Sequence, residues 1–143
     1  MIFKYFLPIF VLLPSVNCLL GFTQSSGAKG ILICDGKPAS GVLVKLWDED
    51  DMPGDLDDLM GSAKTDSKGQ FEIKGSTDEF TPIDVKLAIY HDCNDGIKPC
   101  QRKFIIKIPG KYVTKGKTPK SIYDAGTIQL SGKFPGETRD CLH

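Results

Sequence analysis

The chain has little of what most hydrolytic or redox enzymes need. Its 143 residues include only two histidines, His91 and His143. A serine or cysteine nucleophile needs a base within hydrogen-bond reach, and a hydrolytic metal site needs several converging histidines or carboxylates. The sequence also contains no glycine-rich phosphate loop and no dinucleotide-binding fingerprint. We therefore expect no enzymatic activity and no cofactor, and we expect His91 to be a surface residue at a strand end.

The sequence also lacks a charge imbalance, a zinc-type cysteine spacing and a second long hydrophobic run. The 18 basic and 18 acidic residues cancel, which disfavours nucleic acid as a partner. No pair of cysteines is separated by two residues, so we expect no zinc site. Because the only long apolar run lies at the N-terminus, we expect no membrane-spanning segment in the rest of the chain.

The N-terminal run has the features of a secretory signal peptide. A positive charge precedes an apolar stretch, and the small-residue positions before the cleavage site fall at Val16 and Cys18. The stretch is shorter than the about 20 residues of a spanning helix. We therefore predict that residues 1–20 form a signal peptide, cleaved after Cys18 or Gly21, and that residues 21–143 form one secreted domain. The alternative is a membrane anchor that stays in place.

Removal of the signal would leave four cysteines, Cys34, Cys93, Cys100 and Cys141. An even number in a secreted domain indicates two disulfides, for which three pairings exist. The segment Asn94–Pro99 has strong turn composition, so we predict a bond between Cys93 and Cys100. Cys34 would then hold the C-terminal tail through Cys141. A bond between Cys34 and Cys93 would contradict the strand layout that underlies this prediction.

Alternating apolar residues predict β-strands along most of the chain. The expected strands are Ile31–Cys34, Val42–Trp47, Met60–Asp66, Gly69–Gly75, Ile83–Tyr90, Arg102–Ile108 and Gly126–Leu130. The residues expected to face inward are Val42, Val44, Leu46, Phe71, Ile73, Ile83, Val85, Leu87, Ile89, Phe104, Ile106, Ile108, Ile128 and Leu130. About seven strands with turns between them predict an all-β fold, a two-sheet antiparallel β-sandwich. Ser76–Thr81 is expected to be a connector, and Asp55–Met60 has room for one short helix.

An acidic segment, Asp48–Asp58, follows the first hairpin. Seven of its eleven residues are Asp or Glu, a composition that suggests calcium. The EF-hand pattern fails, however, because Met52 stands where an oxygen ligand is needed and Leu59 replaces the closing glutamate. We expect a solvated, self-repelling loop and no bound metal.

A basic stretch lies farther along this neutral chain. Between residues 98 and 120 there are eight basic residues and no acidic ones. They are Lys98, Arg102, Lys103, Lys107, Lys111, Lys115, Lys117 and Lys120. Such a cluster can attach a protein to anionic lipid at about 1 kcal/mol per cation, or to acidic polysaccharide or an acidic receptor. The alternative is that these residues only keep the surface solvated.

Several segments together resemble the nematode transthyretin-like family of secreted proteins. The segments are GAKGILICDGKPASGVLVKLWDED, KTDSKGQFEIKG, IYHDCNDG, CQRKFIIKIPGKYV, IYDAGTIQL and the closing RDCLH. The resemblance implies a prealbumin-like fold, a secreted location and adaptor roles at cell surfaces or on anionic lipid. The 5-hydroxyisourate hydrolases are similar in fold, but their first-strand histidine and their C-terminal Tyr-Arg-Gly-Ser are both missing here.

From the residues and the resemblance together we expect a secreted extracellular binding protein. It would be an adaptor or carrier at cell surfaces that contacts anionic phospholipid through the basic stretch. The alternatives are a carrier of a small apolar ligand and a structural component of the extracellular matrix. The extracellular partner and the oligomeric state stay open, and neither hormone binding nor the tetramer of vertebrate transthyretin is assumed.

Overall fold

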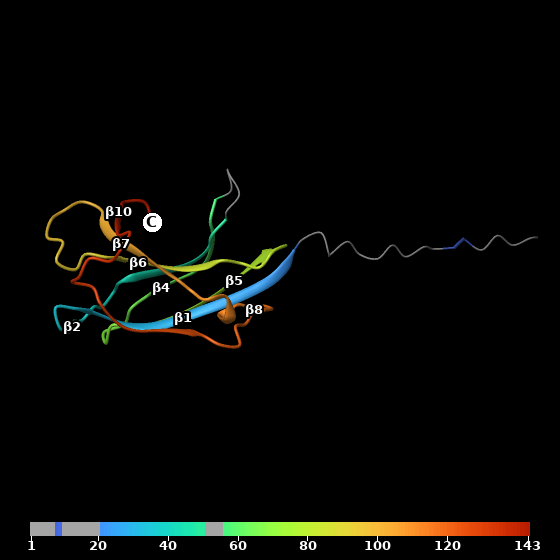
Figure 1. Cartoon of the computed structure of the whole chain (residues 1–143), viewed down its shortest axis with the longest axis horizontal. Helices are drawn as coiled ribbons and strands as arrows, with labels where there is room; N and C mark the ends of the chain where they lie inside the picture. Colours follow the sequence, from blue (N-terminus) through green and yellow to red (C-terminus); the bar gives the residue numbers. More distant parts are fainter. Residues whose placement is uncertain (1–7, 10–20, 51–55) are drawn as a thin grey trace, which may run out of the picture.

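Two β-sheets pack face to face in the computed structural model, which describes residues 8–9, 21–50 and 56–143 (Figure 1). Sheet A contains β1 (Phe22–Cys34), β2 (Lys37–Pro38), β5 (Gln70–Glu79), β8 (Thr114–Lys115) and β9 (Tyr123–Gln129). Sheet B contains β4 (Asp58–Lys64), β3 (Leu43–Asp48), β6 (Val85–His91), β7 (Gln101–Lys107) and β10 (Thr138–Asp140), in the order β10-β7-β6-β3-β4. The predicted all-β sandwich is confirmed. The predicted signal peptide, apart from residues 8 and 9, and residues 51–55 of the acidic segment lie outside the described residues.

Strand β1 organises sheet A. One edge of β1 pairs antiparallel with β5, from Phe22 opposite Glu79 to Ile31 opposite Gln70. The other edge pairs antiparallel with β8 and parallel with β9. The sheets are therefore antiparallel apart from the β1–β9 pairing.

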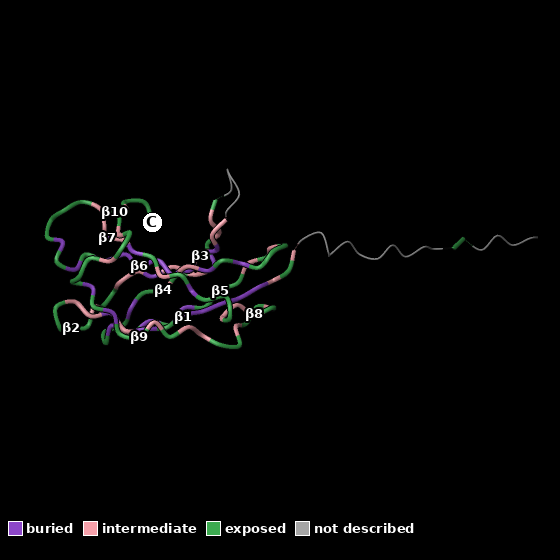
Figure 2. The backbone as a smooth tube through the Cα atoms, in the orientation of Figure 1, coloured by how far each residue is buried: buried purple, intermediate pink, exposed green. Residues whose placement is uncertain are grey.

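The core lies between the sheets and is formed by apolar residues of both. Figure 2 shows the buried residues along the strands in purple. Twelve of the fourteen residues expected to face inward are buried, and Val42 and Ile106 are half-buried against them. Removing this apolar area from water is the main source of stability of such a sandwich. Two residues on the opposite face of β6, Ala88 and Tyr90, are also buried, so something covers the outer side of sheet B.

Two elements differ from the sequence prediction. The expected connector Ser76–Thr81 is largely strand, because β5 continues to Glu79 along the unpredicted first half of β1. No helix forms around Asp55–Met60 within the described residues, since Asp58 begins β4. The helical turn that is described is a single 3₁₀ turn, η2 (Gly110–Tyr112).

Polar residues hold the long β1 in place: the Gln24 amide donates to the Thr81 carbonyl at 2.8 Å and accepts from the Ile83 N–H at 3.1 Å.

Glycines allow β4 and β5 to approach closely where the edges of the two sheets meet. A Cβ atom at Gly75 would collide with the carbonyl oxygen of Met60, and one at Gly61 would lie 2.8 Å from the carbonyl oxygen of Lys74. Any side chain at Gly75 would therefore push the two sheets apart at this edge.

The predicted disulfide pairing is wrong. Cys34 bonds to Cys93 with a Cα–Cα distance of 5.8 Å, and Cys100 bonds to Cys141. The first bond joins the end of β1 in sheet A to Cys93, the second residue after β6 of sheet B, because these strand ends face each other across the sandwich. The second bond ties the loop before β7 to the C-terminal tail. Spacing in the sequence favoured the nearest partner for Cys93, but strand ends decide which cysteines meet.

Candidate functional site

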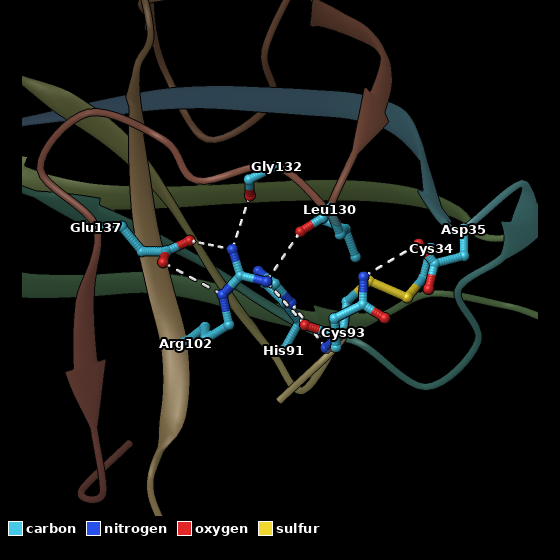
Figure 3. Close-up of a disulfide and its surroundings, with 9 residues drawn as sticks. Cys34, Asp35, His91, Cys93, Arg102, Leu130, Gly132 and Glu137 are labelled. Atoms are coloured by element: carbon cyan, nitrogen blue, oxygen red, sulfur yellow. Dashed lines mark hydrogen bonds and ion pairs between the residues drawn. A yellow bond between two sulfur atoms is a disulfide. The ribbon is translucent and has the colours of Figure 1, made fainter. Parts of the chain in front are cut away.

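One end of the sandwich, where Cys34 meets Cys93, is held by a buried arginine. Arg102 begins the inward-facing positions of β7, and it is 8% exposed. Its guanidinium lies between Glu137 on one side and the carbonyls of Leu130 and Cys93 on the other, next to the disulfide (Figure 3). We call this the locked end; it comprises both disulfides and the contacts of Arg102.

All five N–H groups of Arg102 have partners. Nε and Nη2 donate to the two carboxylate oxygens of Glu137 at 3.2 and 2.8 Å. The remaining donors reach the carbonyl oxygens of Cys93 at 2.7 Å, Leu130 at 3.2 Å and Gly132 at 2.7 Å. A bidentate pair with every donor satisfied is the geometry in which a buried cation is tolerated. Arg102 therefore does not belong to the anionic-binding surface that the sequence analysis predicted, because its charge is turned inward.

His91 lies beside this arginine, and the prediction of a surface histidine is wrong. The residue is 2% exposed, its Nδ1 accepts the Cys93 N–H at 3.1 Å, and it pairs with Arg102 across β6 and β7. Burial lowers the pKa of His91, and the charge of Arg102 lowers it further. His91 is therefore neutral at physiological pH and packs edge-on against Phe104.

The locked end also holds the loop that precedes β7. Arg139 on β10 makes two hydrogen bonds to Asp95, at 2.8 and 2.5 Å. This contact holds the pKa of Asp95 below its usual value. Lys98, another of the predicted surface cations, lies in this loop and is exposed. It is therefore at the opposite end of the sandwich from the lysines that follow η2.

Four of the eight predicted basic residues come together at the other end of the sandwich. The segment from Lys111 to Lys120 runs from η2 through β8 and is held to β1: Lys115 pairs with Gln24, and Gly116 N–H donates to the Thr23 carbonyl at 2.9 Å. Lys117 follows Gly116, and Phe22 precedes Thr23. We define the basic tip as the exposed residues Lys111, Lys115, Lys117, Lys120, Phe22 and Phe80.

The basic tip includes two exposed aromatic groups. Phe22 is 64% exposed and Phe80 is 62% exposed. The backbones of the two residues are close, because Phe22 pairs with Glu79, the residue before Phe80. Exposed aromatic rings beside cations are typical of surfaces that enter the membrane interface. The sequence prediction included the lysines but missed both phenylalanines, which lay in segments assigned no strand.

Three carboxylates meet near the same end, two from sheet B and one from β5 of sheet A. Ligand oxygens of Asp48, Asp58 and Glu79 lie within 4.8 Å of one another. A hydrogen bond to Asp58, burial and the neighbouring acids raise the pKa of Glu79 to about 7. Burial raises the pKa of Asp48, which also accepts the Asp84 N–H at 3.1 Å. A proton shared between Glu79 and Asp58 accounts for their closeness. Within the described residues this is where carboxylates could hold a cation, since the other candidate cluster consists of Asp35 and the two disulfide-bonded cysteines Cys34 and Cys93.

A groove crosses the outer face of sheet B. Its volume is about 880 Å³, within the range of about 300–1,000 Å³ that is usual for small-molecule sites. The register explains the hollow, because Lys45 on β3, Ala88 on β6 and Ile105 on β7 lie in one row. Ala88 is the smallest of these, so the middle of the row is low. The groove is lined by Lys45, Trp47, Leu56, Asp57, Lys86, Ala88, Tyr90, Lys103, Ile105, Asp140, Cys141, Leu142 and His143.

The C-terminal tail closes one end of this outer groove. His143 stacks on Tyr90 with ring centroids 4.5 Å apart, and Lys103 lies 3.4 Å from Asp140. The disulfide between Cys100 and Cys141 holds the tail there. The tail therefore accounts for the burial of Tyr90 on the outer side of the sheet.

The lysines of the outer groove are not equally paired. Lys86 contacts Asp57 at 2.5 Å and Glu49 at 3.9 Å. Burial alone would raise the pKa of Asp57, but the contact with Lys86 outweighs it and lowers that pKa. Lys45 instead lies 5.7 Å from the ring centroids of both Trp47 and Tyr90, and it has no carboxylate partner among the described residues.

Of the residues that line this groove, the sequence predicted Lys103 as a surface-binding residue and Cys141 as a disulfide cysteine. A signal was present, however, because the alternation that turns Val44 and Leu46 inward turns Lys45 and Trp47 outward. The same reasoning places Tyr90 on the outer face. Two large aromatic residues at outward positions of neighbouring strands are unusual for a plain solvated face.

Comparison with known proteins agrees with the fold. Residues 29–109 match the model of the transthyretin-like family. Transthyretin-like protein 5 of Caenorhabditis elegans is 67% identical over 92% of this chain and 94% of its own length. Transthyretin-like protein 2 of the same organism is 51% identical over 98% of this chain and 99% of its own length.

Among solved structures, a 9R-lipoxygenase from Cyanothece matches 75% of this chain and 16% of its own chain, with 24% identity and a TM-score of 0.41. That score is too low to carry an argument. No helix within the described part of the chain has the length and apolar character needed to cross a bilayer. On the family match and the two relatives, the chain belongs to the transthyretin-like family.

Proposed function

We propose that this transthyretin-like protein is a secreted binding protein that attaches to anionic phospholipid surfaces through the basic tip. The observation that carries the proposal is the exposure of four lysines and two phenylalanines near one end of the sandwich. Binding rather than catalysis is the favoured activity, because His91 is buried, neutral and engaged by the Cys93 N–H.

The chemistry of the basic tip suits a membrane interface. Each lysine close to an anionic surface contributes about 1 kcal/mol of binding free energy, and this contribution decays over a distance of about one Debye length from the surface. Phenylalanine rings that enter the boundary between headgroups and acyl chains add apolar contact. Glu79 lies on β5, at the edge of β1 opposite β8, and Asp48 and Asp58 belong to sheet B. We therefore expect the tip to approach the membrane with the β8 side facing it.

The test is binding of the mature protein to phosphatidylcholine vesicles with and without phosphatidylglycerol, over a salt series. A variant with Lys111, Lys115, Lys117 and Lys120 changed to Glu should bind the anionic vesicles much more weakly. Loss of four cations corresponds to about 4 kcal/mol, roughly 1,000-fold at low salt. The double variant Phe22→Ser, Phe80→Ser should weaken binding with little change in the salt dependence.

A matched control separates position from total charge. Lys37, Lys64, Lys68 and Lys133 are exposed and lie at or near the locked end, and changing all four to Glu alters the net charge equally. This variant should retain most of the vesicle binding. Equal losses in the two lysine variants, or no binding of the unmodified protein at low salt, would contradict the proposal.

Secretion is tested separately. When the full chain is expressed in an animal cell, the protein recovered from the medium should begin after Cys18 or after Gly21, as mass spectrometry of the intact chain would determine. Retention of the whole product in the membrane fraction would instead favour an uncleaved anchor.

A further inference from the structure

We propose that the outer groove of sheet B binds an amphipathic monocarboxylate of the fatty-acid class, with Lys45 contacting the carboxylate. This site is distinct from the basic tip, because it lies on the outer face of β3, β6 and β7 rather than at the end of the sandwich. The inference therefore does not depend on the proposed contact with lipid surfaces.

Charge complementarity identifies the head of the ligand. Of the three lysines in the outer groove, Lys86 is paired with Asp57 and Lys103 with Asp140. Lys45 alone has no acidic partner among the described residues, and its contacts are with the rings of Trp47 and Tyr90. A cation against an aromatic face keeps its outer side available to an anion. One uncompensated positive charge favours a ligand with one negative charge.

The floor and one wall of the groove identify the rest of the ligand. Ala88 forms the low centre, Ile105 beside it is 43% exposed, and Leu142 on the tail is 94% exposed. An apolar chain lying over these residues would remove them from water and gain about 25 cal/mol per Å² of apolar surface buried. The volume of about 880 Å³ accommodates a chain of this kind.

Trp47 is the only tryptophan in the sequence and lines the groove, so its fluorescence reports directly on this site. We would titrate the whole mature protein with laurate at physiological salt. Dodecyltrimethylammonium, with the same chain and the opposite charge, and acetate, with the same head and no chain, serve as comparison ligands. Laurate should change the Trp47 emission saturably, and the other two should bind at least tenfold more weakly.

Two variants test separately the contact with the carboxylate of the ligand and the contact with its apolar chain. Lys45→Gln should weaken laurate binding at least tenfold, whereas Lys37→Gln, at an exposed position on β2, should leave it unchanged. Ile105→Ser should weaken laurate binding and make it less dependent on chain length, with circular dichroism confirming that each variant is folded. The four-lysine variant of the basic tip should bind laurate as the unmodified protein does.

The proposal would be overturned by any of three results. One is the absence of a Trp47 response at saturating laurate, and another is equal binding of laurate and dodecyltrimethylammonium. The third is laurate binding that Lys45→Gln leaves intact, with amide chemical-shift changes at the basic tip instead of at Lys45, Ala88 and Ile105.

Discussion

The two ends of the sandwich use the same residue types in opposite ways. At the locked end, two arginines are paired with carboxylates, Arg102 with Glu137 and Arg139 with Asp95. At the other end, the lysines of the basic tip are exposed, and Glu79 faces other carboxylates. Arg102 and the lysines of the basic tip come from the same basic stretch, residues 98–120, so position in the fold decides whether a cation stabilises the protein or is free to bind.

We expect the largest loss of stability from removing the buried cation at the locked end. Arg102→Met leaves Glu137 without its partner and removes donors from the carbonyls of Cys93, Leu130 and Gly132. Loss of one member of a buried ion pair costs roughly 3–5 kcal/mol, so urea unfolding should show a stability decrease of that size.

Two further variants sharpen this prediction. Arg139→Met removes a pair whose arginine side chain is 40% exposed, so its cost should be smaller. Adding Glu137→Leu to Arg102→Met should restore part of the lost stability, because the unpaired carboxylate is then gone. If Arg102→Met were as stable as the unmodified protein, the buried pair would contribute nothing to the stability of the locked end.

The covalent links at the locked end give the next largest effect. Replacing Cys34 and Cys93 together with Ala removes a bond between residues 59 positions apart. The loss of loop-closure entropy predicts a stability decrease of about 4 kcal/mol.

Hydrogen exchange would show which strands lose stability when the bond between Cys34 and Cys93 is removed. Protection should fall in β2 and at the ends of β1 and β6, while β8 and its partner residues in β1 should change little. A uniform loss of protection would mean that the two ends unfold as one unit and are not separately held.

The sequence predicted the sandwich because its inward residues alternate clearly, as in Ile83 to Ile89 and Phe104 to Ile108. The same alternation in β7 places residue 102 inward, so the burial of Arg102 could have been inferred from its parity with Phe104. It was missed because arginine is rarely buried without a partner. Glu137 is that partner, and it lies 35 positions away in a segment with no regular pattern.

The candidate sites were less predictable than the fold because they depend on pairings between strands. The basic tip requires β8 beside the start of β1, and two-residue strands such as β8 leave no periodic signal. The outer groove requires the row of Lys45, Ala88 and Ile105, which only the register creates. The disulfide pairing likewise followed from strand ends that composition does not reveal.

The smallest effect we predict is a difference in pH response between the two ends. Because the pKa of Glu79 is raised to about 7, the folded protein holds a proton that the unfolded chain releases near its ordinary pKa of about 4.3. Its stabilising contribution is therefore present below that value and is lost as pH rises through 7. At the locked end the signs are opposite: the lowered pKa values of His91 and Asp95 mean that stability falls as pH drops below about 6.5 and then below about 3.9.

Glu79→Gln isolates the contribution of Glu79 to the pH dependence of stability. The glutamine amide can still donate to Asp58 but cannot ionise, so this variant should be more stable than the unmodified protein at pH 8 and nearly equal to it at pH 5, as measured by urea unfolding. Glu72→Gln on the same strand, where Glu72 is 3.6 Å from Lys74, is the matched control and should show no such difference between the two pH values. If the stability gap of Glu79→Gln were the same at pH 5 and pH 8, Glu79 would titrate normally and would share no proton with Asp58.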